Sequence, residues 1–173
     1  MARWPPACWR TRVSLRGLNS TVHIVLVHPQ IPQNTGNISR LCAGTNVDLH
    51  LVKPLGFSLE DRYLKRAGLD YWPHVKLHIH ENLQEAIGPV HLNQVAFYST
   101  HAKRPYTEFR PEGDPWFVFG CETSGLPDEL LTEQAERVYK IPITDKVRSL
   151  NLANACAVVL YDAAARNGFD FDA

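Results

Sequence analysis

Residues 119–127 read Phe-Gly-Cys-Glu-Thr-Ser-Gly-Leu-Pro, and the apolar run from Trp116 to Phe119 leads directly into them. The run predicts a buried strand, and the two glycines and the proline that follow predict a bend. Gly120 and Gly125 each permit a positive φ angle or let a ligand approach the bare backbone. This stretch therefore predicts a strand that runs into a bend able to lie against a ligand.

Segments with strand-like and helix-like patterns alternate on both sides of this bend. Short β-branched or alternating runs predict strands at 22–27, 48–52, 74–80, 94–100, 116–119 and 137–141. Helical spacing predicts helices at 34–45, 59–67, 81–87, 127–135 and 150–167, with Asn34 as the N-cap of the first and Gly68 as the C-cap of the second. The alternation predicts an α/β fold with a mostly parallel sheet flanked by helices.

The length and composition fit one globular domain. The chain has 173 residues, of which 45% are hydrophobic and 21% are charged. We expect a single domain over 22–169, a flexible extension over 1–21 and a short tail over 170–173. The extension has four arginines and no acid, but its prolines and its lack of an apolar stretch argue against a signal peptide. A transit peptide is the weaker alternative.

Charge, cysteine and histidine usage exclude several classes of protein. The formal net charge is zero and the pI is about 7.1, which argues against a broadly basic surface that binds nucleic acid anywhere. The four cysteines show no CxxC spacing, so we expect no disulfide framework, and a cytoplasmic location fits. Nor do we expect a metal, because no carboxylate or cysteine stands at ligand spacing from His74, His78, His80 and His101. The chain also lacks a run of about 18 apolar residues, so no membrane-spanning helix is expected.

Two further parts of the chain complete the pattern, one upstream of the bend and one downstream of it in two pieces. Residues 34–40 read Asn-Thr-Gly-Asn-Ile-Ser-Arg, residues 141–143 read Ile-Pro-Ile, and residues 148–152 read Arg-Ser-Leu-Asn-Leu. In this order the segments resemble the signature of the SPOUT-type RNA 2′-O-ribose methyltransferases. They are most similar to the small tRNA (cytidine/uridine) enzymes that act on the first anticodon position. The resemblance implies a C-terminal trefoil knot, S-adenosyl-L-methionine as the cofactor and a homodimer.

The resemblance assigns the catalytic role to Arg40, with Asn34 beside it. A guanidinium stays protonated in proteins, so we expect Arg40 to grip a phosphate and to stabilise the oxyanion that forms on the ribose hydroxyl, rather than to act as a base. Asn37 lies one helical turn before Arg40 and is expected to contact the substrate. The alternative for Arg40 is a surface arginine in an ion pair. The alternatives for Asn34 and Asn37 are an N-cap and a polar first-turn residue, respectively.

The resemblance places the cofactor among three loops. The residues that it implies as cofactor contacts are Ser99, Gly120, Ile141 and Ser149, with Leu150 and Asn151 as second choices. Loops of this kind hold an adenosine through backbone groups and an apolar slot. Glu122 is expected to fix the pocket by accepting hydrogen bonds from loop amides, and Cys121 is expected to be a packed thiol rather than a nucleophile.

The remaining expectations concern the RNA and the partner subunit. Arg148 is a candidate phosphate contact, and Tyr161 is a candidate RNA or interface residue with core packing as the alternative. The last helix is apolar around much of its circumference, so it needs cover from a core or from a second subunit. The substrate that the resemblance favours is the tRNA anticodon stem-loop. A ribosomal RNA enzyme of the same fold and a non-catalytic RNA-binding module are the alternatives.

Overall fold

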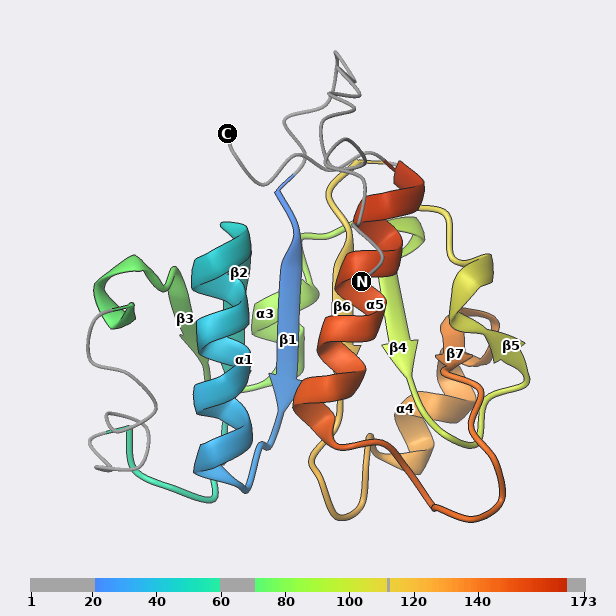
Figure 1. The fold of residues 1–173 in the computed structure, drawn as a ribbon. Helices are drawn as coiled ribbons and strands as arrows, with labels where there is room; N and C mark the ends of the chain where they lie inside the picture. Colours follow the sequence, from blue (N-terminus) through green and yellow to red (C-terminus); the bar gives the residue numbers. More distant parts are fainter. Residues whose placement is uncertain (1–20, 60–70, 112, 168–173) are drawn as a thin grey trace, which may run out of the picture.

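The computed structural model describes residues 21–59, 71–111 and 113–167. Its centre is one seven-stranded sheet with the strand order β3-β2-β1-β6-β4-β7-β5 (Figure 1). The strands are β1 (His23–Val27), β2 (Asp48–Val52), β3 (Leu77–His80), β4 (Val95–Tyr98), β5 (Arg104–Pro105), β6 (Trp116–Phe119) and β7 (Val138–Lys140). All six neighbouring pairs are parallel, so the predicted parallel α/β fold is confirmed.

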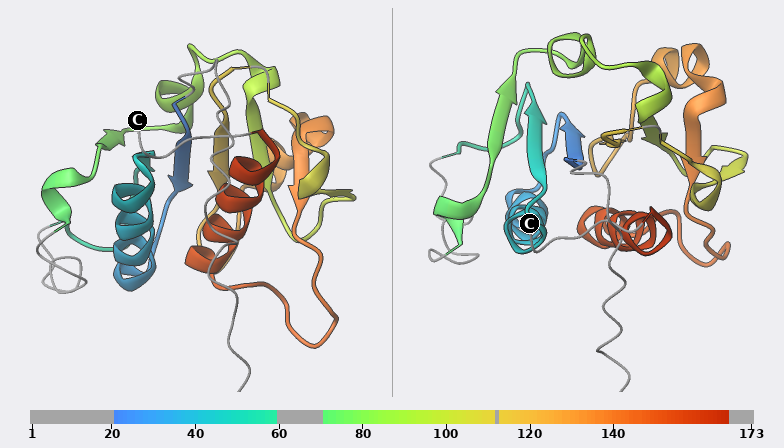
Figure 2. Two further views of the ribbon diagram at one scale, coloured as in Figure 1. Left: turned by 45° about the horizontal axis from the view of Figure 1, so that its top comes forward. Right: turned by 90° about the horizontal axis from the view of Figure 1, so that it is seen from above.

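Helices cover both faces of this sheet, as Figure 2 shows from above. The helices are α1 (Pro32–Thr45), α3 (Leu83–Ile87), α4 (Asp128–Glu133) and α5 (Leu152–Asn167). The long helices α1 and α5 lie side by side on one face, where Ile38 and Leu160 are fully buried. The short helix α3 packs on the other face through Ala86 and Ile87. Burial on both faces explains why β1, β4 and β6 are continuous apolar runs rather than alternating ones.

The parallel arrangement gathers the loops that follow the strands at one edge of the sheet. The loops after β1, β4, β6 and β7 all begin at carboxyl ends of strands, and β1 and β6 are direct neighbours. The chain passes from β1 outward to β2 and β3, and β6 and β4 lie on the other side of β1. Open parallel sheets bind their ligands in the crevice at such a reversal of strand order. The fold thus brings the three motif segments to the same edge.

Several predicted boundaries are wrong, each for a local reason. Helix α1 begins at Pro32 with Ile31 as its N-cap, so Asn34 is not the cap but a buried residue of the first turn. Proline suits the first helical position because its φ angle is already helical and it has no N–H to satisfy. Strand β3 begins at Leu77 because residues Trp72–His74 form a 3₁₀ turn. Helix α5 begins at Leu152, and the other elements differ from prediction by a few residues at their ends.

Some of the predicted segments lie outside the residues that the structure describes. The helix expected at 59–67 with its Gly68 cap, the extension at 1–21 and the tail at 170–173 lie wholly or almost wholly outside the described residues. The trefoil knot stays a prediction from the family. Among the residues that the structure describes, no helix has the length and apolar character needed to span a bilayer.

Candidate active site

Glu122 connects the bend after β6 to the start of α1. Its carboxylate accepts hydrogen bonds from the backbone N–H of Gln30 at 2.9 Å, from the backbone N–H of Ile31 at 3.2 Å and from the side-chain amide of Asn34 at 3.0 Å. The hydroxyl of Thr123 adds a bond to the Gln30 side chain at 2.7 Å. A carboxylate has enough acceptor sites for three donors, and charge-assisted bonds of this kind are the stronger ones. The expected structural role of Glu122 is therefore in keeping with its contacts.

Asn34 extends this network to the third motif segment. Its side-chain oxygen accepts a hydrogen bond of 2.9 Å from the amide of Asn151. The oxygen of Asn151 in turn accepts from the backbone N–H groups of Ala153 and Asn154, which makes Asn151 the capping residue of α5. Asn34 is buried, and its amide uses both its donor and its acceptor for these contacts. One chain of hydrogen bonds thus joins residues 34, 122 and 151, which are far apart in sequence.

The two glycines of the bend are needed for different reasons. A Cβ atom on Gly120 would lie 2.0 Å from the carbonyl carbon of Gly125 and 2.2 Å from the nitrogen of Leu126. Gly125 has φ = +73°, a conformation that side chains rarely adopt, and it donates its N–H to the Cys121 carbonyl at 3.0 Å. Gly120 is therefore required by the backbone of the bend itself, before any ligand is considered.

Cys121 lies inside this bend and is 7% exposed. Its sulfur is 3.0 Å from the Ser124 hydroxyl and 3.6 Å from the Thr123 hydroxyl. Burial raises the pKa of the thiol, but hydrogen bonds from Ser124 and Thr123 outweigh it and lower the pKa to about 7. The buried position agrees with the expectation of a packed thiol.

Arg40 does not join the network within one subunit. It lies on the exposed side of α1, six residues and therefore about 9 Å along the helix axis beyond Asn34. Its guanidinium sits 5.1 Å from the ring centre of Tyr71, whose hydroxyl donates to the Gly36 carbonyl at 3.0 Å. Asn37 is also exposed and lies one turn away on the same face. Sequence reasoning missed Tyr71, which carries no motif signal.

Three of the expected cofactor contacts directly follow three adjacent strands of the sheet. Ser99 follows β4, Gly120 follows β6 and Ile141 follows β7, and β4 is paired with both of the others. The Ser99 N–H donates to the Tyr139 carbonyl at 3.0 Å, which fixes the end of β4 against β7. Ile141 packs against the core below, whereas Ser149 is exposed and Leu150 half-buried in the loop before α5.

This arrangement fits an adenosine cofactor on structural grounds. The end of β4 and the bend after β6 offer backbone groups at neighbouring positions. Ile141, directly after the neighbouring strand β7, offers an apolar side chain, and half-buried Leu150 offers another in the loop before α5. Adenosine sites combine these two kinds of surface. The capping of α5 by Asn151 and the closed bend at Gly120 hold two of the three loops in place. This combination of backbone and apolar groups suits S-adenosylmethionine.

The expected RNA contacts are both exposed. Arg148 is exposed in the loop before α5. Tyr161 is 53% exposed and Val158 is 38% exposed, both on the outer side of α5. The core alternative for Tyr161 is therefore wrong, because more than half of the residue faces away from the protein interior.

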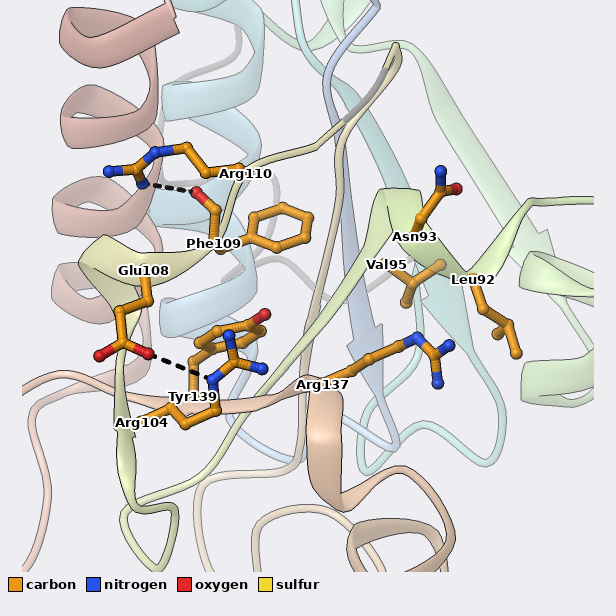
Figure 3. Close-up of a pocket in the computed structure, with 9 residues that line it drawn as sticks. All are labelled: Leu92, Asn93, Val95, Arg104, Glu108, Phe109, Arg110, Arg137 and Tyr139. Atoms are coloured by element: carbon orange, nitrogen blue, oxygen red, sulfur yellow. Dashed lines mark hydrogen bonds and ion pairs between the residues drawn. The ribbon is translucent and has the colours of Figure 1, made fainter.

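A small polar pocket lies near the amino-terminal ends of β4 and β7, and Figure 3 shows the residues that line it. Its lining includes Arg104, Arg110 and Arg137, close to the amino-terminal end of β4 and to β7. The Nε of Arg104 forms an ion pair with Oε2 of Glu108 at 3.2 Å, and the Arg104 guanidinium carbon lies 4.8 Å from the ring centre of Tyr139. This pocket contains none of the predicted cofactor residues, and the chemistry of the motif segments belongs to the opposite edge.

Replacing Glu122 by alanine is expected to lower the free energy of unfolding by about 2 kcal/mol, because three donors lose a charged acceptor and one of them belongs to buried Asn34. Chemical denaturation measures this loss. The matched control is Glu133→Ala, which removes an exposed carboxylate from α4 and should leave the unfolding free energy nearly unchanged. Equal effects of the two substitutions would show that the network does not stabilise the bend.

Comparisons with known proteins agree with this geometry. The sequence pattern of the SpoU rRNA Methylase family matches residues 21–161. A tRNA (cytidine(34)-2′-O)-methyltransferase from Methylovorus glucosotrophus (strain SIP3-4) is 44% identical over 147 residues, which are 84% of this chain and 96% of that protein. A solved structure described as "Structural insights into the 2-OH methylation of C/U34 on tRNA" is 40% identical with a TM-score of 0.79, covering 87% of this chain and 99% of that one.

More distant structures share the fold alone. The SpoU methyltransferase AviRb from Streptomyces viridochromogenes, solved in complex with AdoMet, superposes with a TM-score of 0.74 at 19% identity, over 86% of this chain and 58% of that one. The family pattern covers most of the present sequence, and it includes the Asn34 and Glu122 segments that the hydrogen-bond network joins. The chain belongs to the SpoU rRNA methylase family.

Proposed function

We propose that this protein transfers a methyl group from S-adenosylmethionine to the ribose 2′-hydroxyl of nucleotide 34, the wobble position of tRNA. The observation that carries the proposal is the hydrogen-bond chain from Glu122 through Asn34 to Asn151, which assembles the three motif segments at one edge of the sheet. The names of the 44% identical relative and of the 40% identical structure support position 34 of tRNA as the target.

The residues of this chain hold and orient the reactants. The ends of β4, β6 and β7 would hold the cofactor through Ser99, Gly120 and Ile141, and the loop before α5 would close over it through Ser149 and Leu150. When bound, S-adenosylmethionine supplies an electrophilic methyl group on a sulfonium. Holding the ribose hydroxyl in line with that group provides much of the rate, because a bimolecular step becomes effectively unimolecular.

Arg40 supplies the permanent positive charge in this proposal. Negative charge develops on the ribose oxygen as it attacks, and a fixed guanidinium stabilises that charge without having to reorganise. The same group can hold the adjacent phosphate through its planar donors. Asn37, one turn earlier on the exposed side of α1, is placed to contact the sugar or the neighbouring phosphate. Arg148 provides a second phosphate contact beside the cofactor loop.

A homodimer completes the site in this proposal. Arg40 is about 9 Å along α1 from Asn34 and is exposed, with its guanidinium over the Tyr71 ring. The exposed side of the neighbouring helix α5 carries Val158 and Tyr161, two apolar or aromatic residues that a partner subunit would cover. A second copy packed on α1 and α5 would bring Arg40 to the cofactor loops across the interface. We also place the enzyme in the cytoplasm, where its tRNA substrate is found.

Mass spectrometry of anticodon fragments tests the proposal directly. Incubating tRNA with the protein and S-adenosylmethionine is expected to add one methyl group to the ribose of nucleotide 34 and to no other nucleotide. Methylation of ribosomal RNA but not of tRNA would favour the second enzyme class, and the absence of methylation on either RNA would favour a non-catalytic RNA-binding module. Binding to tRNA should weaken steeply with salt, because each phosphate contact releases counterions.

A further inference from the structure

A group of histidines lies far from the motif loops. The histidine patch consists of His23, Asp48, His50, His78, His80 and Trp116, which come from β1, β2, β3 and β6. Strand register explains the grouping, since His23 is aligned with Asp48 and His50 with His78. Alternation along β1 and β2 places these side chains on the face that α3 covers, opposite α1 and α5.

Close contacts connect the rings of this patch. Nδ1 of His23 lies 3.0 Å from Nε2 of His50, and Nδ1 of His50 lies 2.9 Å from Nε2 of His80. The Trp116 ring stacks on His23 with the ring centres 3.9 Å apart. His78 stacks on His50 at 4.5 Å. Such packing fixes the ring planes and leaves little freedom to the nitrogen atoms that face one another.

We propose that His23, Asp48 and His50 bind one divalent transition-metal ion, for which zinc is the test ion. One ligand atom from each of the three residues lies within 4.8 Å of the other two. Two imidazoles and a carboxylate form a donor set typical of zinc and of its neighbours in the first transition row. The fourth position would be left to water or to His78, whose Nε2 is 3.0 Å from Asp48 Oδ2.

The distances suit a metal with small adjustments. Two nitrogens bound to one tetrahedral zinc at about 2.0–2.1 Å lie about 3.3 Å apart. The nitrogens of His23 and His50 are 3.0 Å apart, so the rings would separate by a few tenths of an ångström. The carboxylate oxygen Oδ1 of Asp48 is shielded from solvent and accepts no hydrogen bond from any residue that the structure describes, although Lys76 Nζ lies 3.8 Å away in an ion pair. A bound cation would give this oxygen a close partner.

The surrounding residues resemble the outer shell of a metal site. Histidines that bind metal usually present their other ring nitrogen to an acceptor, which fixes the tautomer. His50 has such a partner in His80, whose own Nδ1 is 3.9 Å from Glu85. His78 contacts the second oxygen of Asp48 in the same supporting way. These contacts orient the three ligands whether or not the ion is bound.

The charge state of the buried ligand is compatible with metal binding. Burial, together with the neighbouring histidines, lowers the pKa of His50 to about 3, and burial also lowers the pKa of His23. A lowered pKa favours the neutral imidazole, which is the form that binds metal. The bound ion would link β1 to β2 at the ends of the strands opposite the motif loops, so it would stabilise the sheet rather than take part in methyl transfer.

Calorimetric titration of the chelator-treated full chain with zinc tests the proposal. We expect one zinc ion per chain, and cobalt in its place should give the visible absorption bands of a tetrahedral N/O site. Asp48→Asn, which keeps the side-chain shape, and His23→Ala, at a half-buried position, should each weaken zinc binding by about 100-fold or more. The control His91→Ala removes an exposed histidine outside the patch and should leave the affinity unchanged.

Two results would overturn the proposal. The first is the absence of stoichiometric zinc binding by the folded wild-type chain, which would leave the patch as a set of hydrogen-bonded and stacked histidines. The second is binding that persists at wild-type affinity in Asp48→Asn and His23→Ala, because the ion would then sit elsewhere. Circular dichroism of both variants establishes that they are folded, and methylation activity is not needed for either readout.

Discussion

Replacing Arg40 by alanine is expected to lower kcat for methyl transfer by about 10²–10³-fold, the usual cost of removing one group that stabilises a developing oxyanion. Affinity for S-adenosylmethionine should stay close to that of the wild type, because the described contact of Arg40 is with the Tyr71 ring and not with the cofactor loops of its own subunit. Single-turnover methylation and calorimetric cofactor titration measure the two quantities separately. Arg40→Lys retains the charge without the planar donors, so its kcat is expected to lie between those of the wild type and of Arg40→Ala.

The route by which Arg40 acts can be tested with mixed dimers. In this design one subunit carries Arg40→Ala and the other carries Ser149→Trp, which places a bulky ring in the exposed cofactor loop. If Arg40 acts across the interface, the mixed dimer regains one intact site, because the wild-type loop and the wild-type arginine then come from different subunits. If both homodimers and the mixed dimer are inactive, the cross-subunit assignment is wrong. A wild-type rate for Arg40→Ala alone would remove Arg40 from the mechanism.

Gly120→Ala is expected to have the largest effect on stability, a loss of more than about 4 kcal/mol of unfolding free energy or a failure to fold. The added Cβ would lie 2.0 Å from the Gly125 carbonyl carbon and 2.2 Å from the Leu126 nitrogen, and both of these atoms are backbone. Neither can move away by a change of rotamer, so the bend must open. Opening the bend would also displace Cys121, whose carbonyl accepts the Gly125 N–H.

Gly44 offers the matched control for this substitution. It lies near the end of α1, and a Cβ atom there would have nothing within 4 Å. Gly44→Ala should therefore raise the unfolding free energy by about 0.5–1 kcal/mol through the higher helix propensity of alanine. Thermal and chemical denaturation of both variants provide the comparison. A Gly120→Ala protein with wild-type stability and cofactor affinity would contradict the steric account of the bend.

The fold was largely predictable because its signals are local. Apolar runs at β1, β4 and β6 and the helical spacing in α1 and α5 each lie within a few residues, and their alternation implies a parallel sheet. The errors have local causes as well. Pro32 starts α1 two residues before Asn34, and the 3₁₀ turn at Trp72–His74 delays β3. Helix boundaries depend on single backbone hydrogen bonds, which a sequence pattern does not resolve.

The candidate site was predictable only in part. The motif resemblance implied Asn34, Gly120 and Asn151 as site residues, and a hydrogen bond joins the side chains of Asn34 and Asn151. The partners that position them could not be found in this way. Gln30 and Tyr71 contribute a backbone N–H and an aromatic ring, and neither contribution leaves a recognisable pattern in sequence. The steric need for Gly120 likewise depends on backbone atoms five and six residues away.

The histidine patch shows clearly which contacts a local sequence pattern predicts and which depend on strand pairing. The sequence draws attention to His78 and His80, which are two residues apart on one strand, but gives no reason to join them to His23 or Asp48. Only the pairing of β1, β2 and β3 in a fixed register brings those side chains together. The sequence by itself determined the strands, the helices and the three motif segments, because periodicity and glycine placement act over short distances. The tertiary structure alone decided which distant side chains touch, because contacts across a parallel sheet depend on strand order and register.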